Sequence, residues 1–461
     1  MSEGAVKKEE KPRKFQAIRG TRDLLPPETT LWNRAEQTAH EVFATFGFGE
    51  IRVPIFESTD LFARSIGAET DVVSKEMYTF GGFAEFSDRV REGRMEGTLS
   101  EMQPEEMISL RPEATASVCR AYIEHNMQQL PQPVKLYYLG PMFRRERPQK
   151  GRYRQFYQIG AEVLGGTDAP AIDAEVIEMV MTFFERLELQ GVQLDINSIG
   201  CRECRPKYVE ILRAELQKVK DRLGADSQRR IETNPLRVLD SKLENEQAII
   251  EKLPRIGDHL CEECAAHYAA VKHQLEMRGV IYRENWRLVR GLDYYMRTTF
   301  EITASGLGSQ NAVCGGGRYD GLVELLGGPP TKGIGFAIGE DRLILSLQES
   351  GKAPAQQGRD VYIAWMGEHA HATAIRAAKD LRKAGFSVEL PPVEQKFGKA
   401  LKRADKLGAR FALILGDNEV SSGEWTLKTL ATGEQAKFTE TQLLDFLQME
   451  KRKADPSLRS G

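Results

Sequence analysis

Two segments rich in apolar and aromatic residues, Val134–Phe143 and Gln155–Leu164, are separated by one hydrophilic connection. Neighbouring strand-forming runs joined by a single connection predict an antiparallel β-hairpin. The connection has one acidic residue, Glu146, against six cations: Arg144, Arg145, Arg147, Lys150, Arg152 and Arg154. Cations that acids do not balance repel one another, so a polyphosphate or a nucleic-acid backbone is the expected partner. A merely solvated loop is the alternative.

Further apolar patterns organise the N-terminal region. Helical spacing over Thr29–Phe46 predicts an amphipathic helix that ends at Gly47. The segment GEIRVPIFE, residues 49–57, predicts a strand that Pro54 interrupts. A proline inside a strand indicates an edge or an interface position. The polar, glycine-bearing stretch at about 80–108 has no clear period, and we interpret it as a surface loop.

Helices are expected in the middle of the chain. Asp168 is the expected N-cap of a helix that has Pro170 in its first turn and continues to Leu189. Segment 109–125 predicts a strand end followed by a helix, and the junction contains Glu113 and Thr115, where polar groups can face a cleft.

Strand patterns return after residue 279. Segments 280–289 and 298–303 both predict strands. RGLDYY, beginning at Arg290, lies between them. Three consecutive glycines begin at Gly315, and such a run indicates that the backbone approaches a neighbouring group closely. Segment 332–347 predicts a glycine-rich strand that enters a helix bearing Arg342 in its early turns, where a cation can meet a phosphate.

The C-terminal part has a different pattern, which begins after a linker at 350–358. Strands are expected at 360–366, 386–390 and 411–415, and helices at about 368–384 and 395–407. This alternation predicts a separate α/β domain over 359–461 with some parallel pairing. Cations spaced by three and four residues share one face of the second helix: Lys396, Lys399, Lys402, Arg403 and Lys406. Such a face can track phosphates, and a solvated helix face is the alternative.

The composition describes a soluble globular protein. The chain has 461 residues, enough for two to four domains and for a core that needs no disulfides. A net charge of -3 gives no overall attraction to nucleic acid or membrane, so any nucleic-acid surface must be local. The charged residues 1–14 fit a disordered tail rather than a secretory signal, and no apolar run has membrane-spanning length. We therefore expect a cytoplasmic protein with no membrane partner.

Four of the six cysteines form two Cys-x-x-Cys pairs, Cys201 with Cys204 and Cys261 with Cys264. In a cytosolic chain such pairs indicate metal or redox chemistry before disulfides. Together they are the ligand set of a closed tetrahedral zinc site, because thiolates suit zinc where carboxylates suit magnesium. Helices must bring the distant pairs together. Reduced cysteines packed as small hydrophobes and a redox pair are the alternatives.

The phosphate-binding patterns GxxxxGK[ST] and GxGxxG are absent from the sequence. Over residues 16–447 the chain instead resembles bacterial histidyl-tRNA synthetases, a family of class II aminoacyl-tRNA synthetases. GEIRVPIFE is similar to the first class motif, FRRERPQKGRYRQFYQIGAEVLG to the second and GIGFAIGEDRL to the third. RGLDYY and GGGRYDGL are similar to the two histidine-specific signatures.

The resemblance implies an α+β catalytic domain over 15–349 on an antiparallel sheet of about six or seven strands. It also implies a mainly helical inserted domain at about 201–279 and a C-terminal anticodon-binding domain. The expected assembly is a homodimer joined through the first motif. ATP with Mg²⁺ and L-histidine would give histidyl-adenylate and pyrophosphate, and the histidyl group would then pass to tRNA(His). Catalysis would be positioning and charge stabilisation at phosphorus, with no protein nucleophile.

Motif positions imply the nucleotide contacts. Arg144 would hold the α-phosphate and Arg342 the γ-phosphate, and Phe156 would stack beneath the adenine. Arg152 and Glu146 complete the expected ATP site. In the same loop, Gln149 is expected to contact the extra guanosine that bacterial relatives read at the 5′ end of the tRNA.

The histidine contacts follow in the same way. Arg290 would bridge the substrate carboxylate and the α-phosphate, which makes it, with Arg144, a catalytic residue. Glu162 and Tyr295 would pair with the imidazole. The remaining residues expected around histidine are Glu113, Ala114, Thr115, Gln158 and Tyr294.

Two other classes of function are alternatives. A non-catalytic paralogue that regulates ATP phosphoribosyltransferase in histidine biosynthesis resembles the catalytic domain but lacks the C-terminal one. An RNA-binding module without catalysis would need neither Arg290 nor Arg342. Pyrophosphate exchange with histidine separates all three.

Overall fold

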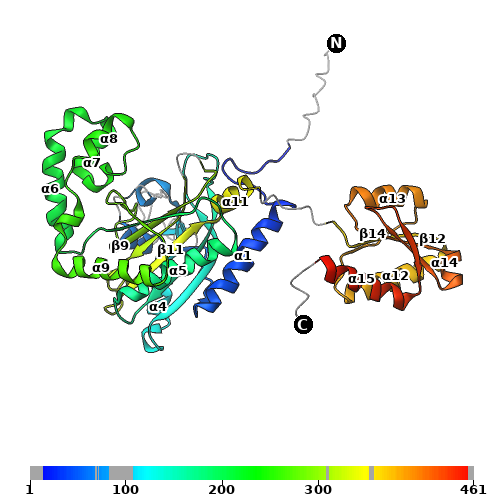
Figure 1. Ribbon diagram of the computed structural model, residues 1–461. Coiled ribbons are helices and arrows are strands. Elements are labelled where there is room, and N and C mark those ends of the chain that lie inside the picture. The colour runs from blue at the N-terminus through cyan, green and yellow to red at the C-terminus, as the bar shows by residue number, and fades with distance from the viewer. Residues whose placement is uncertain are drawn as a thin grey trace, which may run out of the picture. The chain divides into compact units, whose positions relative to one another are not determined.

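The computed structural model describes residues 14–67, 70, 72–81, 107–307, 311–351 and 358–454. The chain divides into two compact units, Met1–Ala353 and Pro354–Gly461, whose elements are labelled in Figure 1. The expected tail at 1–14 lies outside the described residues except for Lys14, and most of the expected linker at 350–358 lies outside them as well.

An eight-stranded sheet is the centre of the first unit. Its order is β1 (Gly49–Glu50), β5 (Val134–Phe143), β6 (Gln155–Leu164), β11 (Gly333–Gly339), β10 (Ala312–Arg318), β9 (Met296–Thr303), β7 (Gln193–Ser198) and β8 (Arg283–Glu284). The six inner strands are antiparallel throughout, and only the two-residue edge strands pair in parallel. The predicted hairpin is confirmed, with Val134 opposite Leu164. The expected six or seven strands become eight because both edges carry a short added strand.

Helices cover both faces of this sheet. On one face lie α1 (Glu28–Thr45), α5 (Pro170–Arg186), α9 (Glu262–Met277) and α11 (Glu340–Glu349), as Figure 1 shows. The other face packs against α4 (Thr115–Glu124) and α10 (Leu322–Leu325). Tyr137 and Tyr138 of β5 belong to the two different cores, because successive residues of a strand point to opposite faces. The predicted first helix is confirmed.

A second, three-stranded sheet stands beside the first, in the order β2 (Phe56–Ser58), β4 (Met107–Leu110), β3 (Tyr78–Gly81). It packs with α2 (Thr59–Ile66). The break expected at Pro54 is confirmed, since β1 and β2 on its two sides belong to different sheets. The loop interpretation of 80–108 is wrong at both ends, which pair as strands across a long chain separation. Residues 82–106 lie outside the described residues.

The segment after Cys201 is mainly helical, as predicted. It contains α6 (Cys204–Lys218), α7 (Ala225–Thr233) and α8 (Glu244–Ile250), which Figure 1 shows together, and it ends in α9. Buried apolar residues of these three helices form a core of their own. The later half of α9 differs from the rest, because Val271 and Leu275 enter the core of the large sheet.

Two further expectations in this unit are wrong. Asp168 does not cap α5, whose N-cap is Ala169 and which ends at Arg186 rather than Leu189. The Asp168 carboxylate instead pairs with Arg297 at 2.8 Å and with Lys332 at 3.4 Å. Segment 280–289 is strand only at β8, because the rest of it has no neighbouring strand with which to pair.

The second unit is built on a five-stranded sheet with the order β13 (Val388–Glu389), β12 (Val361–Met366), β14 (Phe411–Gly416), β15 (Trp425–Thr429), β16 (Gln435–Phe438). The predicted parallel pairing is confirmed for β12 with β13 and β14. Helices α12 (Glu368–Lys383) and α15 (Glu440–Ala454) cover one face, and α13 (Phe397–Lys406) covers the other. Helix α14 (Asp417–Ser422) follows β14.

The predicted lysine face is exposed on α13. Lys399, Lys402 and Lys406 lie in solvent on this helix, and Lys396 occupies its N-cap. Ala400 and Ala404 on the opposite side are buried against the sheet. None of the helices described in either unit is long and apolar enough to cross a membrane.

Candidate active site

A cavity of about 360 Å³ opens over the antiparallel sheet of the first unit. Eleven of the site residues expected from the sequence line it: Glu113, Thr115, Arg144, Glu146, Arg152, Phe156, Gln158, Arg290, Tyr294, Tyr295 and Arg342. They come from the start of α4, the β5–β6 hairpin, the segment before β9 and the start of α11. Sheet pairing therefore brings four separate sequence segments together in one wall of the cavity.

Arg290 lies across the middle strands of the sheet. Its Nη1 donates to Glu301 Oε2 at 3.0 Å, and its guanidinium lies 5.7 Å from the centre of the Tyr295 ring. A Cβ at position 315 would lie 2.1 Å from Arg290 Nη2, so only glycine leaves room for this guanidinium. The close approach expected from the glycine run is confirmed. Arg290 Nε is buried and has no hydrogen-bond partner among the described residues, which leaves a donor for a bound anion.

One end of the cavity is cationic. Arg144 donates through Nε to Pro112 O at 3.0 Å and lies 5.3 Å from the Phe156 ring. Arg152 pairs with Glu146 at 3.1 Å, the same carboxylate that lies 4.0 Å from Arg144. Burial lowers the pKa of Arg342, and Arg152 acts in the same direction. Three arginines face one carboxylate here, so this end suits a polyphosphate.

The other end is polar and buried. The Glu113 carboxylate accepts the backbone N–H groups of Thr115 at 2.6 Å and Ala116 at 3.0 Å, at the start of α4. Burial raises the pKa of Glu113. Gln158 lines the cavity, and its buried Oε1 has no hydrogen-bond partner in the described structure. A ligand with N–H donors can satisfy both groups.

Two expected residues lie behind this wall. Ala114 is fully buried and packs in the core beneath α4. Glu162 is also buried: its Oε1 accepts from Thr115 Oγ1 at 2.7 Å and its Oε2 from the Tyr319 hydroxyl at 2.5 Å. Burial raises the pKa of Glu162 to about 8. This shift favours the neutral form of the Glu162 carboxyl group near neutral pH.

This shift predicts a pH-dependent difference in folding stability between the protein and its Glu162→Gln variant. The carboxyl group has a pKa near 4.5 when unfolded and about 8 when folded. Because the folded pKa is raised, the unfolded chain releases the proton first, and stability falls as pH rises from 4.5 to 8. Glutamine mimics the neutral acid, so thermal unfolding over this range should show the wild type losing stability relative to the variant. Parallel profiles would mean that Glu162 is already ionised in the fold.

The sequence reasoning did not single out several residues that complete the site. Tyr319 supports Glu162, Glu301 pairs with Arg290, and Asp341 accepts the Tyr157 N–H at 3.0 Å. Each lies within a segment that the sequence pattern identifies, since Tyr319 follows the glycine run, Glu301 lies within the strand after RGLDYY and Asp341 precedes Arg342. Their roles depend on cross-strand partners, which a local pattern does not identify.

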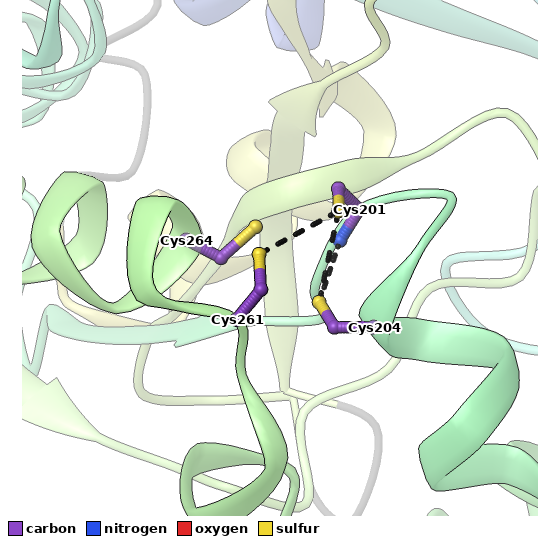
Figure 2. Close-up of side chains that lie close together, drawn as sticks. All are labelled: Cys201, Cys204, Cys261 and Cys264. Atoms are coloured by element: carbon purple, nitrogen blue, oxygen red, sulfur yellow. Dashed lines mark hydrogen bonds between the residues drawn. The ribbon is translucent and has the colours of Figure 1, made fainter.

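The four paired cysteines form a separate cluster (Figure 2). Figure 2 shows their side chains pointing toward one another from the segments that begin α6 and α9. All four sulfur atoms lie within 4.8 Å of one another, with Cys201 Sγ 3.7 Å from Cys204 Sγ and 3.9 Å from Cys261 Sγ. Burial opposes ionisation of Cys201, but backbone hydrogen bonds lower the pKa of its thiol to about 7. The predicted meeting of the pairs is confirmed.

Comparison with known proteins agrees with this geometry. A family model for histidyl-tRNA synthetase matches residues 84–343, and one for an anticodon binding domain matches residues 360–450. Histidine–tRNA ligases of Solibacter usitatus and Koribacter versatilis are 53% and 51% identical, covering 93% and 94% of this chain and 98% and 96% of their own. Apo histidyl-tRNA synthetase of S. aureus has a TM-score of 0.74 at 37% identity, covering 94% of this chain and 100% of its own.

The chain belongs to the histidyl-tRNA synthetase family.

Its activity is that of this family, an ATP-dependent aminoacyl-tRNA synthetase acting as a histidine–tRNA ligase. The predicted class II fold, with its antiparallel sheet and C-terminal domain, is confirmed. The regulatory paralogue considered from the sequence lacks the C-terminal domain, whereas residues 360–450 match the anticodon-binding model. The synthetase interpretation therefore holds over that alternative.

Proposed function

We propose that both steps of histidine activation and transfer occur in the cavity over the antiparallel sheet. The histidine carboxylate oxygen attacks the α-phosphorus of ATP, a new P–O bond forms, and pyrophosphate leaves with the electrons of the broken bond. The 3′-terminal adenosine hydroxyl of the tRNA then attacks the histidyl carbonyl, and AMP leaves. The observation that carries this proposal is the position of Arg290, which lines the cavity with residues of both the cationic and the polar end and whose buried Nε has no hydrogen-bond partner among the described residues.

The cationic end is the proposed ATP site. Arg144 holds the α-phosphate and Arg342 the γ-phosphate, and Phe156 stacks beneath the adenine. Arg152 and Glu146, which pair at 3.1 Å, orient the nucleotide. Mg²⁺ would accompany the phosphates, because a hard cation prefers phosphate oxygens and water. Arginine suits these positions because its planar fork matches phosphate oxygens.

The polar end is the proposed histidine site. Glu113, Thr115 and the backbone at Ala114 receive the ammonium group, and Gln158 and Tyr294 line the side-chain pocket. Tyr295 and the buried Glu162 are assigned to the imidazole. Loss of one N–H donor in a competing amino acid would leave these buried groups unpaired, so isosteres should be rejected strongly.

The activity is tested by histidine-dependent exchange of labelled pyrophosphate into ATP. We expect exchange with L-histidine and none above background with glutamine or phenylalanine, which match it in size but not in hydrogen-bonding pattern. Absence of exchange with every amino acid, in protein whose fold is intact by circular dichroism, would overturn the proposal.

For the tRNA we propose two surfaces. The second unit, 359–461, would bind the anticodon region through Lys396, Lys399, Lys402 and Lys406. In the catalytic domain, 15–349, Gln149 would contact the extra guanosine at the 5′ end of the tRNA. Gln149 lies at the tip of the β5–β6 connection, where its backbone bonds to Arg152 in both directions. A cytoplasmic location, where tRNA is charged, is part of this proposal.

We also propose a homodimer joined at the first motif. Ile55, Phe56 and Phe80 are 44%, 60% and 39% exposed; Phe56 and Phe80 lie on the two outer strands of the three-stranded sheet, β2 and β3, and Ile55 directly precedes β2. Contiguous apolar side chains in solvent mark interaction surfaces.

Light scattering should therefore give a mass of twice 51.9 kDa. Phe56→Lys places a charge in the apolar contact and should shift the protein to monomers. The matched change Leu243→Lys, at an apolar residue that is 49% exposed beside α8, should leave the dimer intact. A wild type that runs as a monomer would contradict this assembly.

Finally, we propose that Cys201, Cys204, Cys261 and Cys264 hold one structural Zn²⁺. The sulfur atoms already lie close enough to share one ion, and four thiolates are a closed zinc ligand set. Protein purified without chelator or metal-affinity resin should contain about one equivalent of zinc. The Cys201→Ser, Cys204→Ser double variant should contain little. A wild-type content below about a tenth of an equivalent would leave the cysteines as packing residues.

A further inference from the structure

The segment Tyr295–Arg297, at the start of β9, touches the first half of the cysteine cluster. Arg297 N–H donates to Gly200 O at 2.8 Å, and Ile199 N–H donates to Arg297 O at 2.9 Å. Arg205, the residue after Cys204, donates through Nη1 to Tyr295 O at 2.5 Å. Two backbone hydrogen bonds next to Cys201 and one from the Arg205 side chain therefore join this part of the cluster to the segment that presents Tyr295 to the cavity.

The second half of the cluster reaches the same segment through an ion pair. Glu263 lies between Cys261 and Cys264, and its carboxylate pairs with Arg297 Nη2. Arg297 also pairs through Nη1 with Asp168 at 2.8 Å. Both halves of the cluster thus meet at one arginine, although more than fifty residues of chain separate them.

Arg297 has an unusual backbone conformation, with φ of +50°. Left-handed geometry is unfavourable for a residue with a Cβ, so surrounding contacts must hold it. At this point the pairing of β10 with β9 shifts register, between Gly317 opposite Thr299 and Arg318 opposite Met296. The conformation of Arg297 changes the direction of the backbone, so that Tyr295 faces the cavity while β9 continues in the sheet.

We propose that the four-cysteine metal site is a clasp that fixes Tyr295–Arg297 and so sets the position of Tyr295 for histidine. The inference rests on the proposed histidine site and on the proposed zinc. Bonds from four thiolates to one ion hold both halves of the cluster at a fixed separation, whereas protonated thiols make only weak contacts. Arg205 and Glu263 are then positioning residues, which act on the substrate through Tyr295.

The clasp should affect histidine and not ATP. Arg144, Arg152 and Phe156 come from the β5–β6 hairpin, and Arg342 comes from α11. These elements lie on other strands of the sheet and are anchored by their own contacts, such as Arg342 Nη1 to Ala312 O at 2.8 Å. Loss of the metal should therefore raise KM for histidine selectively, which a general loss of folding would not do.

The first test removes and restores the metal. Zinc is stripped from the full chain with a chelator, and pyrophosphate exchange is measured before stripping, after it, and after addition of Zn²⁺ alone. We expect KM for histidine to rise about tenfold, KM for ATP to stay within about twofold, and zinc to restore the first value. Equal changes in both constants, or no change after the zinc is gone, would overturn the inference.

The second test keeps all four cysteines. Glu263→Gln removes the ion pair to Arg297, and Glu262→Gln is its matched control, an exposed neighbour in the same first turn of α9. Arg205→Met removes the bond to Tyr295 O, and Arg205→Lys tests whether a positive charge rescues it. With zinc content unchanged, Glu263→Gln and Arg205→Met should raise KM for histidine and Glu262→Gln should not.

The outcomes distinguish failure of this inference from failure of the proposed function and of the proposed zinc site. A wild type without histidine-dependent exchange defeats the proposed function, and a wild type without zinc defeats the metal site and the clasp together. A wild type that exchanges and holds zinc, but whose Glu263→Gln and Arg205→Met variants match Glu262→Gln in KM for histidine, defeats the clasp alone.

Discussion

Replacement of Arg290 by histidine is expected to lower histidine-dependent pyrophosphate exchange by at least about 100-fold while the fold persists. A fixed charge aimed at a reacting phosphorus in a dry site contributes roughly 3 kcal/mol or more to the transition state. Arg290 is largely buried, and its Nε has no partner among the described residues, so water replaces it poorly. Exchange is measured at saturating ATP and histidine, with circular dichroism as the check on folding.

Two controls sharpen this result. Arg290→Lys keeps the charge but not the planar fork, and should recover only part of the activity. Arg283→His removes an arginine that is 62% exposed and pairs with Asp195 on the sheet edge, away from the cavity lining, and should leave exchange unchanged. Exchange within tenfold of wild type in Arg290→His would show that this guanidinium is not aimed at the reacting phosphorus.

Truncation after Gly351 is expected to lower tRNA charging by at least about 100-fold in kcat/KM and to spare part of the pyrophosphate exchange. The chain divides near this point, at Ala353, and every residue lining the cavity precedes it. The cations of α13 are lost with the second unit, and phosphate contacts supply much of the affinity for nucleic acid. Charging and exchange are assayed on the same preparation.

A full-length protein with Lys399, Lys402 and Lys406 changed to glutamine is the matched control. It keeps the second unit and removes only the charge, so charging should weaken and should depend less steeply on salt. Charging that survives truncation at physiological salt would mean that the lysine face of α13 is ordinary solvated surface.

The local pattern of apolar and polar residues was sufficient to predict much of the fold. The bounds of β5 and β6 follow from their apolar and aromatic runs, because side chains alternate along a strand whatever it pairs with. The same reasoning placed α1 and the alternating elements of the second unit. It was wrong at 280–289 and at Tyr78–Gly81, where strand formation depends on whether a partner strand is present. It was also wrong at Asp168, whose carboxylate pairs with Arg297 instead of capping the helix.

For the site, the sequence by itself determined which residue types and motifs are present, and the resemblance of five motifs to one family pointed to the cavity-lining arginines and tyrosines. Tertiary structure decided which of them meet. Arg290 faces Glu301 across strands, Glu162 lies behind the wall against Tyr319, and the cysteine pairs converge on Arg297. The physical reason is that burial and partner charge depend on contacts between distant segments, which only sheet register and helix packing establish.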